Sequence, residues 1–366
     1  MSSGALPESG WRLGPGDPGW VSYIMPAHNV AGLIEETLES CRAQCHRPLE
    51  VVVVDDGSTD ATAAVVEAYR ERHAAPDFVV RLLRQRNSGP CVARNSGLKA
   101  SRGKILGFLD SDDLIPTYRT RFLREALEGH GAEVAYGTSV RFRDLPPPDA
   151  AAGGSDREGA PVGWEEASTR PEAKFVPALW TFLMTRELAE RVGPISEEFV
   201  YNEDFEYITR LRMACSRMLK SQVVVHHYRI RAGSITATAR PANARDRLRA
   251  ATTIVETLST RGRLDAENQR ILANVFLICG IECVRHGLPG EARQSLGMGA
   301  QLERRKVLAS LLHLSGLVLG TSVGCHVGRA VIRGRAAARG ILAASSGGHG
   351  RPVPPASSLP LGMPPT

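Results

Sequence analysis

The sequence lacks a secretory signal and any pattern of paired cysteines. Seven cysteines occur among 366 residues, with no Cys-x-x-Cys pair and no cysteine–histidine cluster at zinc-binding spacing. Residues 1–19 are rich in glycine, proline and serine and have no basic start followed by an apolar run. These absences predict a flexible N-terminus over residues 1–19 and a cytoplasmic protein in a reducing compartment.

Acidic residues are absent after Glu303, although eight arginine and lysine residues follow it. The formal net charge of +6 therefore belongs to the end of the chain. A basic segment of this kind favours an anionic partner, and we expect a peripheral contact with the inner face of the plasma membrane. Aromatic residues do not alternate with these charges, which argues against a nucleic acid partner.

Charged residues are also missing from 307–328, where glycine recurs at every fourth position from Gly316 to Gly328. Interior glycines each cost a helix in water about 1 kcal/mol relative to alanine, so this segment needs either lipid or a packing partner. Both alternatives remain open at this point. We predict a helical region over residues 246–343 and a disordered tail over residues 344–366, which are rich in proline, glycine and serine.

Short β-rich segments alternate with helical patterns in the first part of the chain. Strands are predicted at 21–25, 50–54, 79–83 and 105–109, with apolar residues at helical spacing between them. Such βαβ units form a mostly parallel sheet flanked by helices, which is an α/β fold. Ligands of these sheets bind beyond the carboxyl ends of the strands, so the residues after each strand are candidates for a site.

The pattern is less regular further along the chain. Residues 145–163 are rich in proline, glycine and alanine and predict a mobile loop. Beyond it we predict helices at 186–192 and 204–214, a strand at 222–227 and helical structure from residue 246.

Two carboxylates, Asp55 and Asp56, end a strand of four valines. A carboxylate at this place can accept the N–H of a nucleotide base. A turn at Gly57 followed by a helix cap at Ser58 or Thr59 explains the motif better when it is taken alone, and only the wider pattern of motifs favours the nucleotide site.

Asp110 and Asp112 follow another apolar strand and can both turn toward one hard cation. Mg²⁺ and Mn²⁺ prefer oxygen ligands and keep waters and substrate phosphates around them. Asp113 adds a third carboxylate within four positions, and such charges repel one another without a cation. This favours a metal site over solvated helix-capping residues.

Two further motifs carry charge. Arg94 lies where a helix begins, so it can meet a phosphate or form a surface ion pair. Glu203 and Asp204 introduce another helix, where the helix dipole favours anions, and one of them can act as a general base. An acidic first turn capped by Asn202 is the alternative.

Taken together, these motifs resemble the large family 2 of inverting glycosyltransferases, whose fold is GT-A. The resemblance covers residues 20–238 and rests on five segments in order, namely 21–29, 53–60, 87–97, 108–113 and 202–204. It implies transfer of a sugar from a nucleotide diphosphate sugar, with a UDP-sugar favoured, to an acceptor hydroxyl on a glycan, a lipid-linked sugar or a small molecule. It also implies Mn²⁺ or Mg²⁺ as cofactor and a place in cell-surface polysaccharide, glycolipid or secondary-metabolite glycan synthesis.

The resemblance implies roles for single residues. The nucleotide pocket would be formed by Pro26, Ala27, Asn29, Asp55, Asp56 and Arg94, with Asp56 holding the base and Arg94 near the ribose or diphosphate. Asp110 would contact the ribose and, with Asp112, the metal. Asp204 matches the catalytic base, and Glu203 is its neighbour.

Two positions depart from the family pattern. Arg231 stands where family members often carry a metal-binding histidine, and an arginine cannot ligate a metal. Either His226 or His227 completes the metal site, with His227 the candidate that we assign, or Arg231 clamps the diphosphate as a cation. His28 replaces a frequent tyrosine, which changes the surface offered to the base.

Two other functions stay open on the sequence. A nucleotidyltransferase also uses a parallel sheet and acidic metal ligands, but it usually carries a glycine-rich loop after its first strand, and none is visible here. An inactive nucleotide-sugar-binding or scaffolding protein is the second alternative. The intact Asp110, Asp112 and Asp204 argue against it, whereas Arg231 keeps it open. We expect acceptor choice to lie in residues 145–180 and in the helical region.

Overall fold

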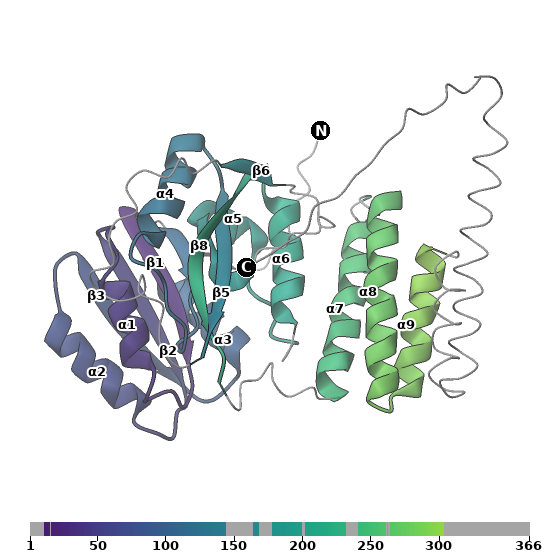
Figure 1. Cartoon of the computed structure of the whole chain (residues 1–366), viewed down its shortest axis with the longest axis horizontal. Coiled ribbons are helices and arrows are strands. Elements are labelled where there is room, and N and C mark those ends of the chain that lie inside the picture. The colour runs from purple at the N-terminus through teal and green to yellow at the C-terminus, as the bar shows by residue number, and fades with distance from the viewer. Residues whose placement is uncertain are drawn as a thin grey trace, which may run out of the picture. The chain divides into compact units, whose positions relative to one another are not determined.

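An eight-stranded sheet organises the part of the chain that the computed structural model describes (Figure 1). The described residues are 11–14, 16–143, 164–167, 178–199, 202–231, 241–260, 262 and 264–303. The predicted loop at 145–163, the glycine-bearing segment 307–328 and the tail 344–366 lie outside them.

The first four strands are parallel and confirm the predicted βαβ pattern. They are β1 (Asp17–Ala27), β2 (Leu49–Asp56), β3 (Phe78–Gln85) and β4 (Gly103–Phe108), in the spatial order β3-β2-β1-β4. The connecting helices are α1 (Ile34–Arg42), α2 (Thr62–His73) and α3 (Pro90–Ala100). All eight residues of β2 are buried, as its valines indicated.

The second half of the sheet contains a reversal that the sequence did not predict. The strand β7 (Phe182–Thr185) runs antiparallel to both β4 and β5 (Val134–Phe142). Next come β8 (Met218–Arg229), parallel to β5, and β6 (Glu165–Ala167) at the outer edge. Because β7 is reversed, the short 3-10 helix η2 (Leu179–Thr181) before it lies at the edge where β4, β5 and β8 end.

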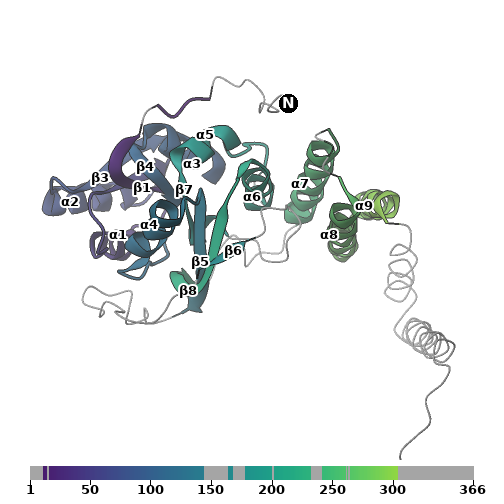
Figure 2. The same cartoon turned by 90° about the horizontal axis from the view of Figure 1, so that it is seen from above.

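Helices cover both faces of this sheet. One core joins α1, α2 and α4 (Arg119–His130) to one face of the sheet, and a second joins α3, α5 (Arg186–Val192) and α6 (Glu203–Ala214) to the other. Figure 2 shows α1 and α4 on one side and α3 and α5 on the opposite side. Burying both faces explains why the central strands are continuously apolar.

Ordered structure begins closer to the N-terminus than the composition of residues 1–19 suggested. The strand β1 begins at Asp17, and Trp11 and Leu13 are buried. The buried Arg186 guanidinium donates to the carbonyl oxygens of Leu13 at 2.9 Å and Gly103 at 2.8 Å. Within residues 1–19, the described residues from Trp11 therefore contribute to the core against the sheet, while residues 1–10 lie outside the described part.

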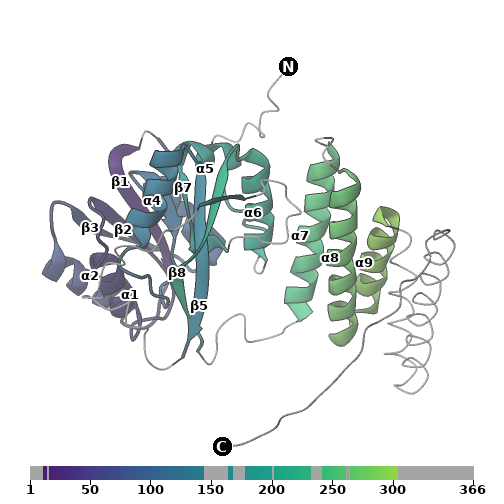
Figure 3. The same ribbon diagram turned by 45° about the horizontal axis from the view of Figure 1, so that its top comes forward.

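Three helices follow the sheet, in agreement with the helical pattern predicted from residue 246. They are α7 (Pro241–Thr260), α8 (Ala266–Arg285) and α9 (Pro289–Leu302), seen together in Figure 3. Asp265 caps α8 by accepting the N–H of Asn268 at 2.9 Å. Over the described ranges, no helix has both the length and the apolar character needed to span a membrane.

Candidate functional site

Asn29 joins the end of β1 to the turn that follows β2. Its side-chain oxygen accepts the N–H groups of Thr59 at 2.8 Å and Asp60 at 3.3 Å, and its own N–H donates to Ser58 Oγ at 3.0 Å. Asn29 has φ 53°, a left-handed conformation that asparagine tolerates better than most residues. The predicted residues around 26–29 and 55–60 are thus brought together.

The expected helix cap at Ser58 or Thr59 was wrong. The helix α2 begins at Thr62, whose N–H donates to Asp60 Oδ1 at 2.9 Å. Ser58 instead uses its hydroxyl to accept the N–H of Asn29, from a segment far away in the sequence. The turn after β2 therefore forms hydrogen bonds with the end of β1, and Ser58 does not cap α2.

Asp55 and Asp56 point to opposite faces of the sheet, because successive side chains of a strand alternate. Asp55 Oδ1 accepts the N–H of Ser58 at 3.1 Å. Asp56 holds the β3–α3 loop by accepting Gln85 Nε2 at 2.8 Å and the N–H groups of Ser88 at 2.9 Å and Gly89 at 2.8 Å. Both carboxylates are buried.

Gly57 permits the close approach of this loop. Its φ is +70°, and a Cβ at this position would lie 2.6 Å from the backbone nitrogen of Asn87. Asn87 in turn lies beside His28, whose Nδ1 is 3.0 Å from the carbonyl oxygen of Asp56. The result is a polar rim made by the ends of β1, β2 and β3.

Arg94 bridges two carboxylates that the sequence did not connect. From α3 its guanidinium donates to Asp110 Oδ1 at 3.0 Å and to Glu203 Oε1 at 2.8 Å. Burial alone would lower the pKa of Arg94, but the two carboxylates raise it above its ordinary value. Only 7% of the side chain is exposed, so this is a buried bridge and not the surface ion pair considered above.

The bridge fixes one member of the carboxylate pair that begins α6. Burial raises the pKa of Glu203, Arg94 opposes this, and the neighbouring Asp204 adds to it. Asp204 is half-buried, and its Oδ1 accepts the N–H of Phe205 at 2.7 Å. Asn202 occupies the N-cap position, as predicted, but its side chain makes no capping hydrogen bond with α6.

The end of β8 is fastened to the loop after β4. Arg229 donates from its N–H to Asp113 Oδ1 at 2.7 Å and from Nε to the carbonyl oxygen of Asp112 at 2.8 Å. Arg231 donates from Nε to Asp112 Oδ2 at 2.5 Å. The cation that replaces the family's histidine therefore contacts the carboxylate that we predicted to bind metal.

Burial and mutual repulsion raise the pKa values of carboxylates in the loop after β4, residues 110–113, which we call the acidic loop. Burial, then Asp113 and Asp110, raise the pKa of Asp112 to about 6, although Arg231 lowers it. Burial and Asp110 raise the pKa of Asp113 to about 8. Asp113 Oδ2 lies 3.2 Å from Nε2 of His226. Burial and the nearby Arg119 lower the pKa of His226 well below its ordinary value. Both shifts favour the neutral forms of this buried pair, which sequence reasoning had not linked.

The predicted third metal ligand is not gathered with the other two. Across the described ranges, no group of three or more histidine, cysteine, aspartate and glutamate side chains is arranged to hold a metal ion. His227 is buried in β8, and its backbone N–H donates to the carbonyl oxygen of Leu114 at 2.8 Å. Its role as a ligand stays a prediction.

Aromatic side chains that the sequence did not single out lie at the same edge. The Trp180 ring stacks on Tyr228, with centroids 6.0 Å apart, and is 6.0 Å from the ring of His226. Arg141 lies 5.9 Å from the Tyr228 ring. No sequence signal marked Trp180, because its place depends on the reversed direction of β7.

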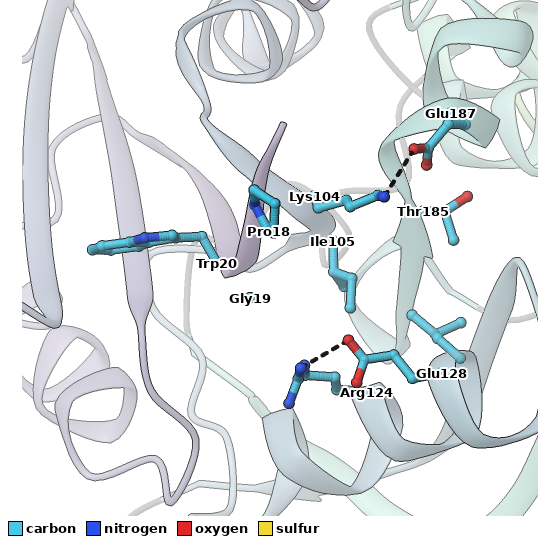
Figure 4. A pocket seen from close by; sticks show the side chains of 10 residues that line it. Pro18, Gly19, Trp20, Lys104, Ile105, Arg124, Glu128, Thr185 and Glu187 are labelled. Carbon is cyan, nitrogen blue, oxygen red and sulfur yellow. Dashed lines mark ion pairs between the residues drawn. The ribbon is translucent and has the colours of Figure 1, made fainter. Parts of the chain in front are cut away.

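A cavity of about 410 Å³ lies at the opposite edge of the sheet (Figure 4). It is lined at the start of β1 by Trp20, at β4 by Lys104 and at α4 by Arg124, with the ion pairs Lys104–Glu187 and Arg124–Glu128 at its rim. None of the predicted site residues lines it.

The sequence and the structure were compared with those of known proteins. Residues 22–186 match the family described as Glycosyl transferase family 2. This segment is a family 2 glycosyltransferase domain. Of the five segments that carried the resemblance, those at 53–60, 87–97 and 108–113 fall wholly within the matched range and 21–29 does so from Ser22, whereas 202–204 lies beyond it.

Curated relatives of this domain include bacterial glycosyltransferases. EpsJ of Bacillus subtilis, named an uncharacterised glycosyltransferase, is 29% identical over 221 residues, covering 59% of this chain and 62% of the relative. The succinoglycan biosynthesis protein ExoO of Rhizobium meliloti is 43% identical over 116 residues, covering 31% and 32%. The chain thus spans less than two thirds of the length of these relatives.

Solved structures share the fold of the domain. The crystal structure of S. aureus TarS 1-349 has a TM-score of 0.56 and 23% identity, and the match covers 86% of this chain and 91% of that one. The mannosyltransferase PcManGT from Pyrobaculum calidifontis, solved with GDP-Man and Mn²⁺, has a TM-score of 0.53 and 21% identity, covering 88% and 87%. These likenesses confirm the predicted α/β GT-A fold.

Proposed function

We propose that the chain transfers a sugar from a nucleotide diphosphate sugar to an acceptor hydroxyl, with inversion at the sugar carbon. The observation that carries this proposal is the Arg94 bridge, which puts the strand-end carboxylate Asp110 next to the acidic first turn of α6. A donor site and a general base must adjoin for such a reaction. TarS in complex with UDP-GlcNAc and PcManGT with GDP-Man support a nucleotide sugar as donor.

The nucleotide would occupy the rim formed by residues 26–29, 55–58 and 87. Asp56 accepts three hydrogen bonds from the protein, and an ionised carboxylate has about four acceptor positions. One acceptor position therefore remains for the N–H of a base, and uracil presents such a group. Arg94 lies beside this rim, and its guanidinium is held between Asp110 and Glu203, so it would place a fixed positive charge near the diphosphate.

Mn²⁺ or Mg²⁺ would be held by Asp110 and Asp112. These cations commonly take one or two protein carboxylates and complete their shell with substrate phosphates and water, so the pair is a sufficient donor set. Burial first, and then the neighbouring Asp113 and Asp110, raise the pKa of Asp112, and a bound cation would favour its charged form. When bound, the cation would neutralise charge on the departing nucleoside diphosphate, and Arg231 would supply a further positive charge beside it.

Asp204 is the residue that we assign as general base. Arg94 ties up Glu203, so of the two carboxylates it is Asp204 that can take the proton of the acceptor hydroxyl. Proton removal on one face of the sugar while the nucleotide leaves from the other gives inversion.

The acceptor would lie over Trp180 and Tyr228. Both rings are half-buried, at the edge where the sheet strands end, and His226 links them to Asp113 of the acidic loop. An aromatic face offers the apolar side of a sugar ring a stacking surface, and Arg141 adds hydrogen-bond donors beside it. We therefore propose a saccharide acceptor, as in cell-envelope polysaccharide or glycolipid synthesis.

A donor screen tests the function. The full chain is incubated with UDP-, GDP- and dTDP-sugars and candidate acceptors, with Mn²⁺ or with a chelator, and release of the nucleoside diphosphate is measured. We expect release with one donor class and its loss with the chelator. Release with none of the donors, together with tight nucleotide binding, would support the inactive binding protein instead.

The variant Asp204→Asn sharpens this test. It should lower kcat by about 100- to 10,000-fold, which is the size of a general-base effect, and leave the Kd for the nucleoside diphosphate unchanged. Asp265→Asn is the matched control, because Asp265 also lies at a helix N-terminus but caps α8. Unchanged turnover of Asp204→Asn removes Asp204 as the base.

A further inference from the structure

The residue before the carboxylate pair of α6 has an unusual backbone. Asn202 has φ 60° and ψ 21°, in the left-handed region that few side chains other than asparagine and glycine adopt readily. Its conformation sets the direction in which Glu203 and Asp204 leave the chain. Something outside α6 must hold it, because its side chain makes no capping bond to its own helix.

The helices α7 and α8 supply that support. Asn202 Nδ2 donates to Asn243 Oδ1 at 2.9 Å, and Asn202 Oδ1 accepts Arg247 Nε at 3.0 Å. Both ends of the amide are therefore held by α7. Arg247 is held in turn by Glu282 of α8, whose Oε1 accepts from its guanidinium at 2.8 Å.

We propose that Arg247 is a positioning residue for sugar transfer, acting through Asn202 to orient Asp204. This inference rests on the proposed function. Proton abstraction depends on placing the base within a few tenths of an ångström, and the Glu282–Arg247–Asn202 chain fixes the peptide that precedes it. The helical region after residue 240 is then part of the catalytic apparatus, although no residue of this chain of contacts touches the nucleotide rim.

An arginine suits this position for a geometric reason. Its planar fork donates from Nε to the amide and from a terminal nitrogen to the carboxylate at the same time. Lysine offers one point charge on a flexible stem, and glutamine is shorter and uncharged. Neither replacement can hold both partners.

The nucleotide side of the site has its own supports. Arg94 reaches Asp110 and Glu203 from α3, and Asp56 holds the loop that carries Asn87. Losing Arg247 should therefore affect the chemical step without weakening donor binding. This separation distinguishes positioning from a general structural role.

The first experiment measures kcat, the donor KM and the Kd for the nucleoside diphosphate in full-length Arg247→Gln. We expect kcat to fall about tenfold or more, with KM and Kd within twofold of the parent protein. Arg245→Gln is the matched control, since Arg245 lies on the same helix and pairs with Glu291 but not with Asn202. An unchanged kcat in Arg247→Gln, or an equal loss of nucleotide binding, overturns the proposal.

A double-mutant cycle adds a second test. Asn202→Gly keeps the left-handed backbone accessible but removes the amide, so Arg247→Gln should have little further effect on kcat in that background. Independent, multiplicative effects of the two substitutions would show that Arg247 does not act through Asn202.

Hydrogen exchange gives a readout that does not need turnover. In Arg247→Gln the amides of the first turn of α6 should exchange at least tenfold faster, whereas those of α3 should not change. Unchanged exchange in α6 contradicts the proposal. If the parent protein turns over no donor, the proposed function fails, yet this exchange result still shows whether Arg247 orders the first turn.

Discussion

Gly57 lies at the point where two strand-end loops meet, and both its backbone and its missing side chain matter there. We expect Gly57→Ala to lower the free energy of unfolding by about 1–2 kcal/mol from the positive φ alone, with a further loss because the Cβ would meet the Asn87 backbone nitrogen at 2.6 Å. Nucleotide affinity should fall with it, since the rim must open. Urea unfolding and calorimetry of nucleoside diphosphate binding measure the two effects.

Gly32→Ala is the control for this substitution. A Cβ at Gly32 meets no atom within 4 Å. Its unfolding free energy and nucleotide affinity should stay close to those of the parent protein. If Gly57→Ala matched Gly32→Ala in both measurements, the close approach at Gly57 would not be needed for the rim.

The polar residues at the strand ends could be predicted from the sequence, and the contacts between them could not. Asp56 and Asn29 stood out because polar residues followed strands of strong apolar pattern. The pairing of Arg94 with Glu203 spans 109 residues, and no local spacing reveals such a contact. The buried Asp113–His226 pair was missed for the same reason.

Among the elements, β7 has the largest effect on the surface that we propose for the acceptor. Its reversal carries η2 to the edge where the other strands end, and with it Trp180. We expect Trp180→Ala to raise the KM for the acceptor about tenfold or more, which corresponds to loss of roughly 1.4 kcal/mol of binding. Hydrolysis of the donor in the absence of acceptor should be unchanged. Steady-state kinetics with varied acceptor measures the effect.

Trp20→Ala is the matched control for this prediction. Trp20 belongs to β1 but lines the cavity at the opposite edge (Figure 4). Its loss should leave the acceptor KM unchanged. Equal effects of the two substitutions on the acceptor KM would argue that Trp180 supports the core and does not bind the acceptor.

The strands and helices of the first half followed from the sequence, because β-branched runs and helical spacing alternate clearly there. The strand β7 has four residues, too few to reveal its direction, which is decided by pairing with β4 and β5. The start of α2 was misjudged because Ser58, which resembles a helix cap, is used by Asn29. Contacts between distant segments therefore explain the misses.

At the scale of the whole molecule, the basic residues after Glu303 lie outside the described part of the structure, so only the sequence describes them. We expect a chain that ends at Glu303 to keep its nucleotide affinity and to lose at least tenfold in affinity for vesicles containing anionic phosphatidylglycerol. Each lysine or arginine near an anionic surface contributes about 1 kcal/mol at low salt. Sedimentation with vesicles measures this, and neutral phosphatidylcholine vesicles are the control. Undiminished binding by the shortened chain would place the membrane contact elsewhere.

The order of strands in the sheet also governs how the chain assembles during its synthesis. The strands β1 to β4 can pair once residue 108 has left the ribosome, but β5 must wait for β7, which is made later and lies between β4 and β5. Until then the outer edge of β4 presents unpaired backbone groups, and such edges pair readily with other chains. At about 5–20 residues per second, this edge stays open for seconds. A nascent chain of this protein is therefore most prone to aggregate before Phe182–Thr185 is made, and slowing translation beyond that point carries a smaller risk.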